Sequence, residues 1–421
     1  MKKTIPINAL KVGMYLAEPA YDSQGDLLLA EEIILTSPNQ IRRLKDAGVQ
    51  VIYIDPEKGE DCQPGEEIVL PEEDEFEPAE SPLGDSLAAG TGRSRLATFR
   101  APPKHHVKPA SFPEEIKRAD QIKREATQLA RSCYEEARKS GVVATDETRG
   151  LVSDIIDSLG RNKFAMLSLV KLKEYDEYTY NHSVNVTTLS LVVARQMNLE
   201  HEQLEELGTR AFLHDIGKMR IPQNILTKGS KLNEQEWAEM KKHTGYGVET
   251  LLESGFTKEE TVIAEQHHER HNGSGYNQGL KGDAIHVYAQ LAALADVYDA
   301  LTTRRAYKAP MIPHLAMASL FKEKGVGFAP EIVMNFVKTI GVFPIGSVVR
   351  LSSGEVAVVV SVNVHDLTKP RVAVLFTRRG IMKRQPMLMD LVEHSPLGIA
   401  EALDPREWKI NVEEFISKAS D

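Results

Sequence analysis

A chain of 421 residues is long enough for two or three domains, at least one of which can bury a sizeable core. Its formal net charge of −10 excludes a general nucleic-acid binder, so any phosphate site has to be locally positive or hold metal ions. The two cysteines, Cys62 and Cys133, are too few for a disulfide framework, and no apolar run reaches the roughly 18 residues of a membrane helix. We therefore expect a cytoplasmic protein that binds neither DNA nor a membrane.

The first 56 residues have the pattern of a small α+β module. Ser37 is a helix cap and Pro38 a first-turn proline, and the helix that they open stops at Gly48. The β-branched run 49–54 then predicts a strand. Nothing in residues 1–56 is a chemical motif, so we expect this module to have a packing or regulatory role.

Residues 57–112 differ in composition from the module before them. They are acidic at first and then rich in glycine and proline, which is typical of a linker. From 113 to 340, apolar residues recur at helical spacing with few strand signals. The first predicted helix covers 114–139, and the sequence leaves open whether two copies of the chain associate through it.

After the helical region the periodicity changes to that of strands. Residues 348–362 are β-branched and contain a hairpin turn at 352–355, and a further strand is predicted at 371–377. The predicted fold class is mainly α: an all-helical core, a small α+β module before it and a small β-rich extension, 341–421, after it.

Several polar residues of the helical region are predicted to face its core. Ala211 and His214 share one helical face with Asp215 beside it, and Asp296 and Asp299 lie three residues apart on an apolar helix. A buried carboxylate next to a buried imidazole is costly without a cation or dense hydrogen bonding. Together with the helices that carry His182 and His243, we therefore expect four separate helices each to direct a histidine or an aspartate toward the core.

The histidines that join this set are His182, His243 and the pair His267–His268. For any one of them, a core histidine bonded to a backbone carbonyl is the ordinary alternative, and a single His-Asp dipeptide is a weak signal. As a set they predict metal chemistry: a carboxylate such as Asp215 bridges two cations, imidazoles complete their coordination, and a bridging hydroxide attacks a phosphodiester.

At these residues the chain resembles the HD-GYP family of bacterial cyclic di-GMP phosphodiesterases, a branch of the HD phosphohydrolases. The resemblance covers about 150–340 and depends on four motifs in order: HDIGK, His243, HHERHNGSGYNQGL and DVYDALTTRRAYK. Residues 1–56 resemble a module that often precedes this domain. The resemblance implies an all-helical core, two transition-metal ions (iron or manganese), and hydrolysis of cyclic di-GMP to linear pGpG and, in some members, to GMP.

The resemblance also implies roles for individual residues. The implied metal ligands are His182, His214, Asp215, His243, His267, His268 and Asp296. Asp215 and Lys218 are the expected catalytic residues, because Asp215 bridges the ions and Lys218 meets a substrate phosphate as a point charge. The expected substrate-binding residues are Lys218, Tyr276, Asp299, Arg305 and Lys308. Some members hold a third ion through a carboxylate at the position that is Tyr178 here, so we expect two ions.

Two positions depart from the family pattern. Asn277 and Ala306 stand where the GYP and Arg-Pro-Tyr motifs have proline, which stiffens a loop by fixing φ. The change puts in question the substrate affinity and any signalling partner that binds the Gly-rich loop 273–282. Two alternatives stay open: a catalytically weak or inactive cyclic di-GMP receptor or scaffold, and an HD hydrolase of another nucleotide. The complete ligand set counts against the first, and the Gly-rich loop against the second.

Overall fold

The structure is a computed structural model of the chain. It describes residues 3–17, 20–21, 27–29, 33–46, 51–61, 107–143, 145–170, 178–228, 230–303, 310–363, 365–405, 408 and 410. The chain forms two compact units, Met1–Asp85 and Ser86–Asp421. The predicted fold class is confirmed, because a helical core follows a small α+β unit in the chain and precedes a small antiparallel sheet. Within the described ranges, none of the helices has the length and apolar character needed to cross a membrane.

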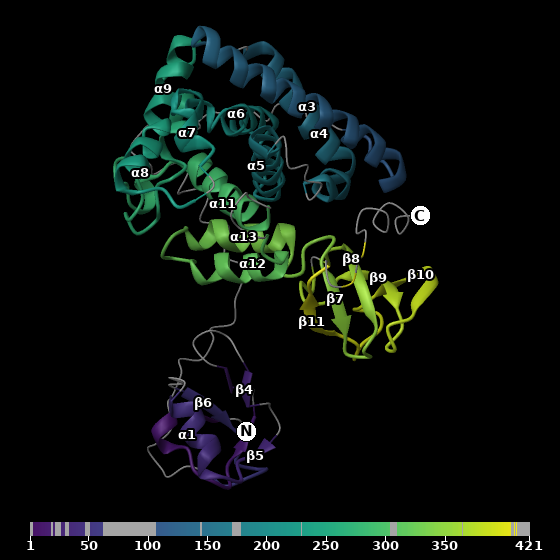
Figure 1. Cartoon of the computed structure of the whole chain (residues 1–421). Helices are drawn as coiled ribbons and strands as arrows, with labels where there is room; N and C mark the ends of the chain where they lie inside the picture. The colour runs from purple at the N-terminus through teal and green to yellow at the C-terminus, as the bar shows by residue number, and fades with distance from the viewer. Residues whose placement is uncertain are drawn as a thin grey trace. The chain divides into compact units, whose positions relative to one another are not determined.

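The first unit is built on a small antiparallel sheet (Figure 1). Its strands pair in the order β1 (Lys3–Pro6), β6 (Val51–Ile54), β2 (Tyr15–Leu16), β5 (Ile33–Ile34), and a separate pair is formed by β3 (Ala20–Tyr21) and β4 (Leu27–Leu29). Helix α1 (Pro38–Asp46) begins at the predicted proline. The predicted helix end at Gly48 and the start of the predicted strand lie outside the described residues.

The second unit is mainly helical. Its helices and 3-10 turns are α3 (Phe112–Ser140), α4 (Thr145–Leu169), α5 (Tyr178–Gln196), α6 (His201–Phe212), η3 (Ile216–Arg220), α7 (Gln223–Leu226), α8 (Glu234–Lys241), α9 (His243–Glu253), η4 (Glu259–Thr261), α10 (Val262–Gln266), η5 (Gly282–Ala284), α11 (Val287–Thr302), α12 (Pro313–Lys322) and α13 (Pro330–Ile340). The long helix predicted over 114–139 is α3. It begins with a capping box in which the Ser111 N–H donates to Glu114 over 3.0 Å, and it ends at Gly141 with φ of 79°.

Helices α3 and α4 lie side by side at the outside of the helical domain (Figure 1). The fully buried Glu115 of α3 joins them, because it accepts hydrogen bonds of 2.7 Å from both Ser158 and Arg161. Helix α5 packs against α3, α6 and α11, and both α5 and α11 are buried for most of their length. These two central helices carry His182 and Asp296 into the interior.

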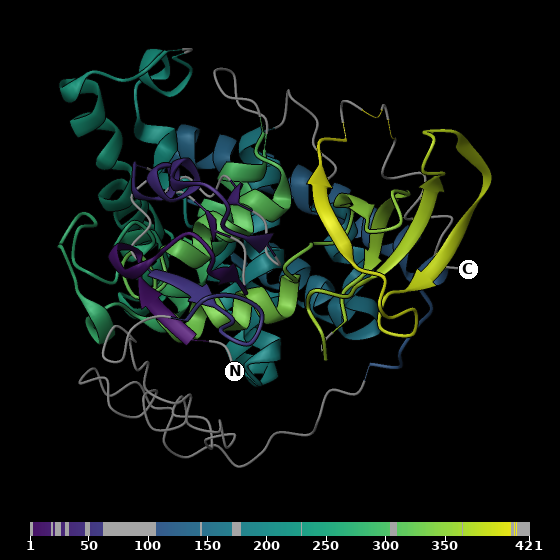
Figure 2. The ribbon, with the colours of Figure 1, turned by 90° about the horizontal axis from the view of Figure 1, so that it is seen from below.

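The C-terminal strands form one antiparallel sheet, which Figure 2 shows as a curved set of arrows in green and yellow. Its order is β10 (Met382–Asp390), β9 (Arg371–Phe376), β8 (Val356–Ser361), β7 (Val348–Leu351), β11 (Ile399–Leu403). Side chains alternate between its two faces. Val356 and Val358 belong to the main helical core, whereas Val359 and Val372 form a second, smaller core. The predicted hairpin and the strand at 371–377 are confirmed as β7, β8 and β9.

Candidate metal centre

His214 and Asp215 lie in the turn between α6 and η3. The prediction that His214 shares a helical face with Ala211 is wrong, because α6 ends two residues earlier, at Phe212. After this helix end the chain makes a close tertiary contact at Gly217. A Cβ there would lie 2.0 Å from the His243 carbonyl oxygen, so only glycine lets η3 pack this tightly on α9. The contact places Asp215 beside His243.

The other candidate ligands come from four further places in the chain. His182 lies in the first turns of α5 and Asp296 in α11, as predicted, while His243 is the first residue of α9. His267 and His268 directly follow the short helix α10. Two helices and three helix ends therefore supply these side chains, rather than four helices.

The ligand atoms form two groups that share one carboxylate. Each group has its atoms within 4.8 Å of one another; the first contains His182, His214 and Asp215, and the second contains Asp215, His243, His267 and His268. Asp296 adjoins the first group, because its Oδ1 lies 3.2 Å from His182 Nε2. All seven predicted ligands are thus brought together in one place.

Asp215 separates the imidazoles into two pairs. Its Oδ2 lies 3.3 Å from Nε2 of His214 and 3.7 Å from Nε2 of His182. Its Oδ1 lies 3.5 Å from Nε2 of His243 and 3.6 Å from Nε2 of His267. Two ligand atoms that each bind one ion at ~2.1 Å lie about 3 to 3.5 Å apart. The spacing on both sides of Asp215 is therefore close to that of two coordination spheres bridged by one carboxylate.

Four of the imidazoles are oriented by a hydrogen bond at Nδ1. The acceptors are Asp299 for His182 (2.8 Å), Ala211 O for His214 (2.8 Å), Met240 O for His243 (2.7 Å) and Ile263 O for His267 (2.8 Å). A proton on Nδ1 leaves the Nε2 lone pair for a metal ion, which is the usual arrangement around metal-binding histidines. All four Nε2 atoms face Asp215.

The charges of the site favour cations. Burial raises the pKa of Asp215, but the paired Lys218 and the surrounding histidines outweigh burial and hold that pKa well below its usual value. Burial lowers the pKa of His243 to about 3, so this ring is neutral, as a metal ligand has to be. Burial also lowers the pKa of His182, but hydrogen bonds with Asp296 and Asp299 raise it to about 9 overall. The surroundings of His182, between the Asp296 and Asp299 carboxylates, thus favour a positive charge, which a proton or a metal ion can supply.

Two buried atoms of the site fit a bound ion. In the part of the chain that the structure describes, no hydrogen bond reaches His214 Nε2 or Asp215 Oδ1, although both atoms are buried. A buried polar atom without a partner is costly, and a metal ion would satisfy both atoms. The donor set of imidazoles and carboxylates suits iron, manganese or zinc. The residues present therefore fit transition-metal binding.

Asp299 lies behind His182, away from the Asp215 carboxylate. Its side chain is fully buried, and its second oxygen accepts a 2.9 Å hydrogen bond from Asn185. The predicted substrate contact of Asp299 has no support in this geometry, because one oxygen holds the His182 ring and the other is bonded to Asn185. These two contacts indicate that Asp299 positions the His182 ring.

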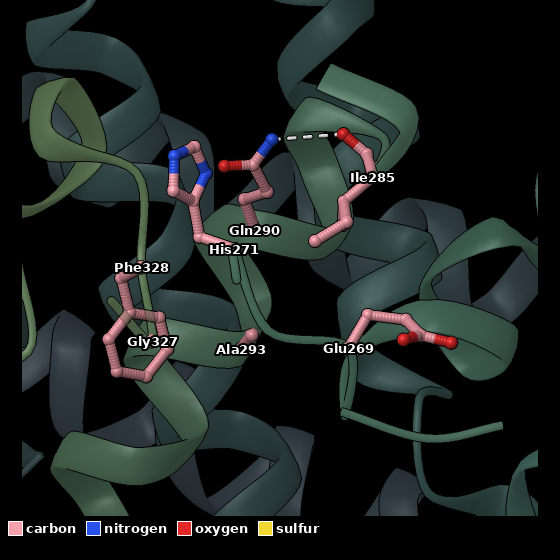
Figure 3. A pocket seen from close by; sticks show the side chains of 7 residues that line it. All are labelled: Glu269, His271, Ile285, Gln290, Ala293, Gly327 and Phe328. Atoms are coloured by element: carbon pink, nitrogen blue, oxygen red, sulfur yellow. Dashed lines mark hydrogen bonds between the residues drawn. The ribbon is translucent and has the colours of Figure 1, made fainter. Parts of the chain in front are cut away.

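The loop that follows His268 is held by Glu269, a residue to which the sequence analysis gave no role. This nearly fully buried carboxylate accepts backbone N–H bonds from Gln278 (2.7 Å), Gly279 (3.2 Å) and Leu280 (3.0 Å). A carboxylate directly after two ligand histidines was the available signal. Glu269 also lines a cavity of about 10 Å³, together with His271 and Gln290 (Figure 3). The ring and the amide lie next to each other there, and Gln290 donates to the Ile285 carbonyl over 2.9 Å.

Tyr276 and Asn277 belong to this loop. The Tyr276 ring stacks on His268 with a centroid distance of 4.7 Å and an interplanar angle of 27°. The Asn277 side chain donates a hydrogen bond to Thr244 Oγ1, next to His243. Asn277 therefore ties the loop to α9 by a bond that proline could not donate.

Some expected contacts lie outside the described residues. These are Arg305 and Lys308, the nearby Ala306, and the Tyr178 side chain with Asp176 and Glu177 before it. The expected guanine and phosphate contacts, and the expectation of two ions rather than three, stay predictions.

Three family models and several known proteins match the chain. The family model described as "HD domain" matches residues 166–332, "Domain of unknown function (DUF3391)" matches 2–148, and "KOW domain associated with HD domain" matches 348–411. A cyclic di-GMP phosphodiesterase of Pseudomonas aeruginosa is 33% identical over 426 residues, which cover 99% of this chain and 95% of that protein.

Two further relatives each match about a third of the chain. A cyclic di-GMP phosphodiesterase response regulator of Xanthomonas campestris is 41% identical over 144 residues, or 34% of this chain and 38% of the relative. A 3'3'-cGAMP-specific phosphodiesterase of Vibrio cholerae is 40% identical over 143 residues, or 34% of this chain and 27% of the relative.

Proposed function

The chain belongs to the HD-GYP family of cyclic di-GMP phosphodiesterases within the HD phosphohydrolases, and we propose that it hydrolyses cyclic di-GMP to linear pGpG at the centre around Asp215, with GMP as the further product that some family members form. The observation that supports this most strongly is the position of Asp215, one oxygen of which faces each imidazole pair. A receptor that only binds the dinucleotide has no need of this costly buried arrangement.

The metal ligands in this proposal divide between two ions, iron or manganese. His182, His214 and Asp296 would hold one ion, and His243, His267 and His268 would hold the other, with Asp215 available to both. When bound, the ions would supply Lewis acidity toward the phosphoryl oxygens and lower the pKa of water. The Nδ1 bonds of the four oriented histidines keep their Nε2 atoms directed at the ions before substrate arrives.

Lys218 and the loop contribute side chains that are not metal ligands. Lys218 is part-exposed on η3 and pairs with Asp215, so its ammonium lies where a phosphate bound at the centre carries negative charge. Tyr276 closes the side of the site next to His268. Arg305 and Lys308 are proposed from the family resemblance alone as contacts for guanine and phosphate.

A second candidate substrate is 3'3'-cGAMP. A relative named for that activity is 40% identical over 143 residues, and one named for cyclic di-GMP is 41% identical over 144 residues, so these partial matches do not separate the two substrates. The relative that matches along 99% of the chain is named for cyclic di-GMP, and for this reason we favour cyclic di-GMP.

A turnover panel tests this proposal. The full chain, purified without oxygen and supplied with iron or manganese, is assayed with equal concentrations of cyclic di-GMP, 3'3'-cGAMP and guanosine tetraphosphate. We expect the highest kcat/KM with cyclic di-GMP and loss of turnover in Asp215→Asn. Asp146→Asn, an exposed aspartate in the first turn of α4, is the matched control. Failure to cleave any cyclic dinucleotide would refute the proposed function.

The remaining organisation is proposed on sequence grounds. We propose a module at 1–56, a linker at 57–112, the catalytic domain at 113–340 and an extension at 341–421. Docking of a signalling protein on loop 273–282 and dimerisation through α3 are proposals of the same kind.

A further inference from the structure

Trp237 is an exposed indole on a helix that does not need it for packing. The side chain is 45% exposed, and none of the eight residues of α8 is buried. The helix is held instead by a capping box, in which the Glu236 N–H donates to Asn233 over 2.8 Å, and by an ion pair of Glu236 with Lys228. A single exposed apolar residue is ordinary, so its neighbours have to decide whether Trp237 has a function.

Those neighbours lead directly to the metal centre. The indole meets the Tyr276 ring edge-on, with centroids 5.9 Å apart and an interplanar angle of 83°. Tyr276 in turn stacks on His268, whose ring belongs to the group around Asp215. The Lys241 ammonium lies 6.0 Å from the centroid of the Tyr276 ring. Two aromatic contacts thus connect an exposed indole to a candidate metal ligand, with a cation beside them.

The two aromatic residues are supported differently. Tyr276 is fixed by its loop, because Glu269 accepts three backbone N–H bonds from residues 278–280 and Asn277 bonds to Thr244. Trp237 is carried by α8, none of whose side chains is buried. Tyr276 therefore forms a supported surface next to His268, and the indole beyond it is exposed to a ligand from solvent.

We propose that Trp237 is a nucleobase-binding residue of this enzyme, and that a purine of the cyclic dinucleotide stacks on its indole while a phosphate lies at the centre around Asp215. A nucleotide carries base and phosphate on one sugar, so one substrate can make both contacts. Every base has a π-face, and the indole is a favourable aromatic partner for it. Lys241 adds positive charge near the substrate phosphates. This inference rests on the proposed function, because it names how that same substrate is held.

Intrinsic fluorescence tests the contact directly. The chain has only two tryptophans, and the second, Trp408, packs on Phe376 beside the C-terminal sheet. In the full chain carrying Trp408→Phe, Trp237 is the only indole. Titration with the non-hydrolysed bis-phosphorothioate analogue of cyclic di-GMP should quench its emission in a saturable way. Emission that stays constant up to saturating analogue contradicts the inference.

Steady-state kinetics gives the second readout. Trp237→Ala should raise KM by about 5- to 150-fold, the equivalent of one lost base–aromatic stack, with kcat nearly unchanged. Trp237→Phe should recover most of the loss. Phe321→Ala is the matched control, because Phe321 on α12 is an aromatic residue of similar exposure, 43%. A wild-type KM in Trp237→Ala, or a lower kcat at constant KM, would overturn the inference. The proposed function would still stand in that case, provided that the wild type turns over cyclic di-GMP. Absence of turnover in the wild type would remove the proposed function, and quenching then decides the inference alone.

Discussion

Replacement of Asp299 by asparagine should weaken metal binding without disturbing the fold. Asp299 is fully buried and accepts hydrogen bonds from His182 Nδ1 (2.8 Å) and from Asn185 (2.9 Å). Asparagine has nearly the same volume, so the change leaves no cavity. Its amide can donate to Nδ1, however, and the ring proton then moves to Nε2, where it blocks the metal lone pair.

The expected magnitude follows from this geometry. Loss of a hydrogen bond that orients a metal-binding histidine costs 10- to 100-fold in metal affinity or activity, or roughly 1.4 to 2.7 kcal/mol. Only the ion next to His182 should be affected, because the histidines near Asp215 Oδ1 have their own backbone acceptors. Activity should therefore return at high metal concentration.

The assay is kcat/KM as a function of added manganese for the wild type and Asp299→Asn, with the bound metal measured on the same samples. Asn185→Ala is the control, because it removes the other partner of Asp299 and leaves the His182 contact. We expect it to reduce stability more than metal affinity. Wild-type metal affinity in Asp299→Asn would show that the ring is not oriented by this carboxylate.

Three further predictions concern the loop after His268. Glu269→Gln should lower the free energy of unfolding by about 1 to 3 kcal/mol, because three backbone N–H groups lose a charged acceptor. An unchanged denaturation midpoint would show that these hydrogen bonds to Glu269 do not stabilise the loop. Asn277→Ala and Thr244→Val should each raise KM and should not add in the double variant, since both remove the same bond; additive effects would exclude that bond as the cause. A high-resolution crystal structure should contain one ordered water between His271 Nδ1 and Gln290 Oε1. Among the described residues neither of these buried atoms has a hydrogen-bond partner, and the cavity is about the size of one water. A direct contact between the His271 ring and the Gln290 amide would contradict this prediction.

Local periodicity was sufficient where a side chain belongs to a regular helix. The apolar stripes around His182 and Asp296 placed both residues on buried faces, and the structure has them on α5 and α11. The end of α6 before His214 had no such signal. The turn that follows it brings Gly217 against the His243 carbonyl, a contact between segments far apart in the sequence that local periodicity cannot predict. The role of Glu269 could not be predicted for the same reason, because it depends on residues 278–280 folding back onto its carboxylate.

The sheet shows the same limit. Strands β7, β8 and β9 are apolar and β-branched and are predicted from the sequence, whereas the two edge strands, β10 and β11, are not. Edge strands carry polar residues and tolerate proline, so they lack a clear alternating pattern. β10 contains Pro386 and is irregular between Met382 and Met387, where its register against β9 shifts.

The central claim is that Asp215 bridges two metal ions between two sets of imidazoles. Crystals of the full chain, grown without oxygen in the presence of iron or manganese, can be measured at the absorption edge of the metal. The claim predicts two anomalous peaks, one on each side of the Asp215 carboxylate, each within about 2.3 Å of the Nε2 atoms of its own set. A metal-loaded, active sample that shows a single peak, or peaks away from Asp215, would contradict it.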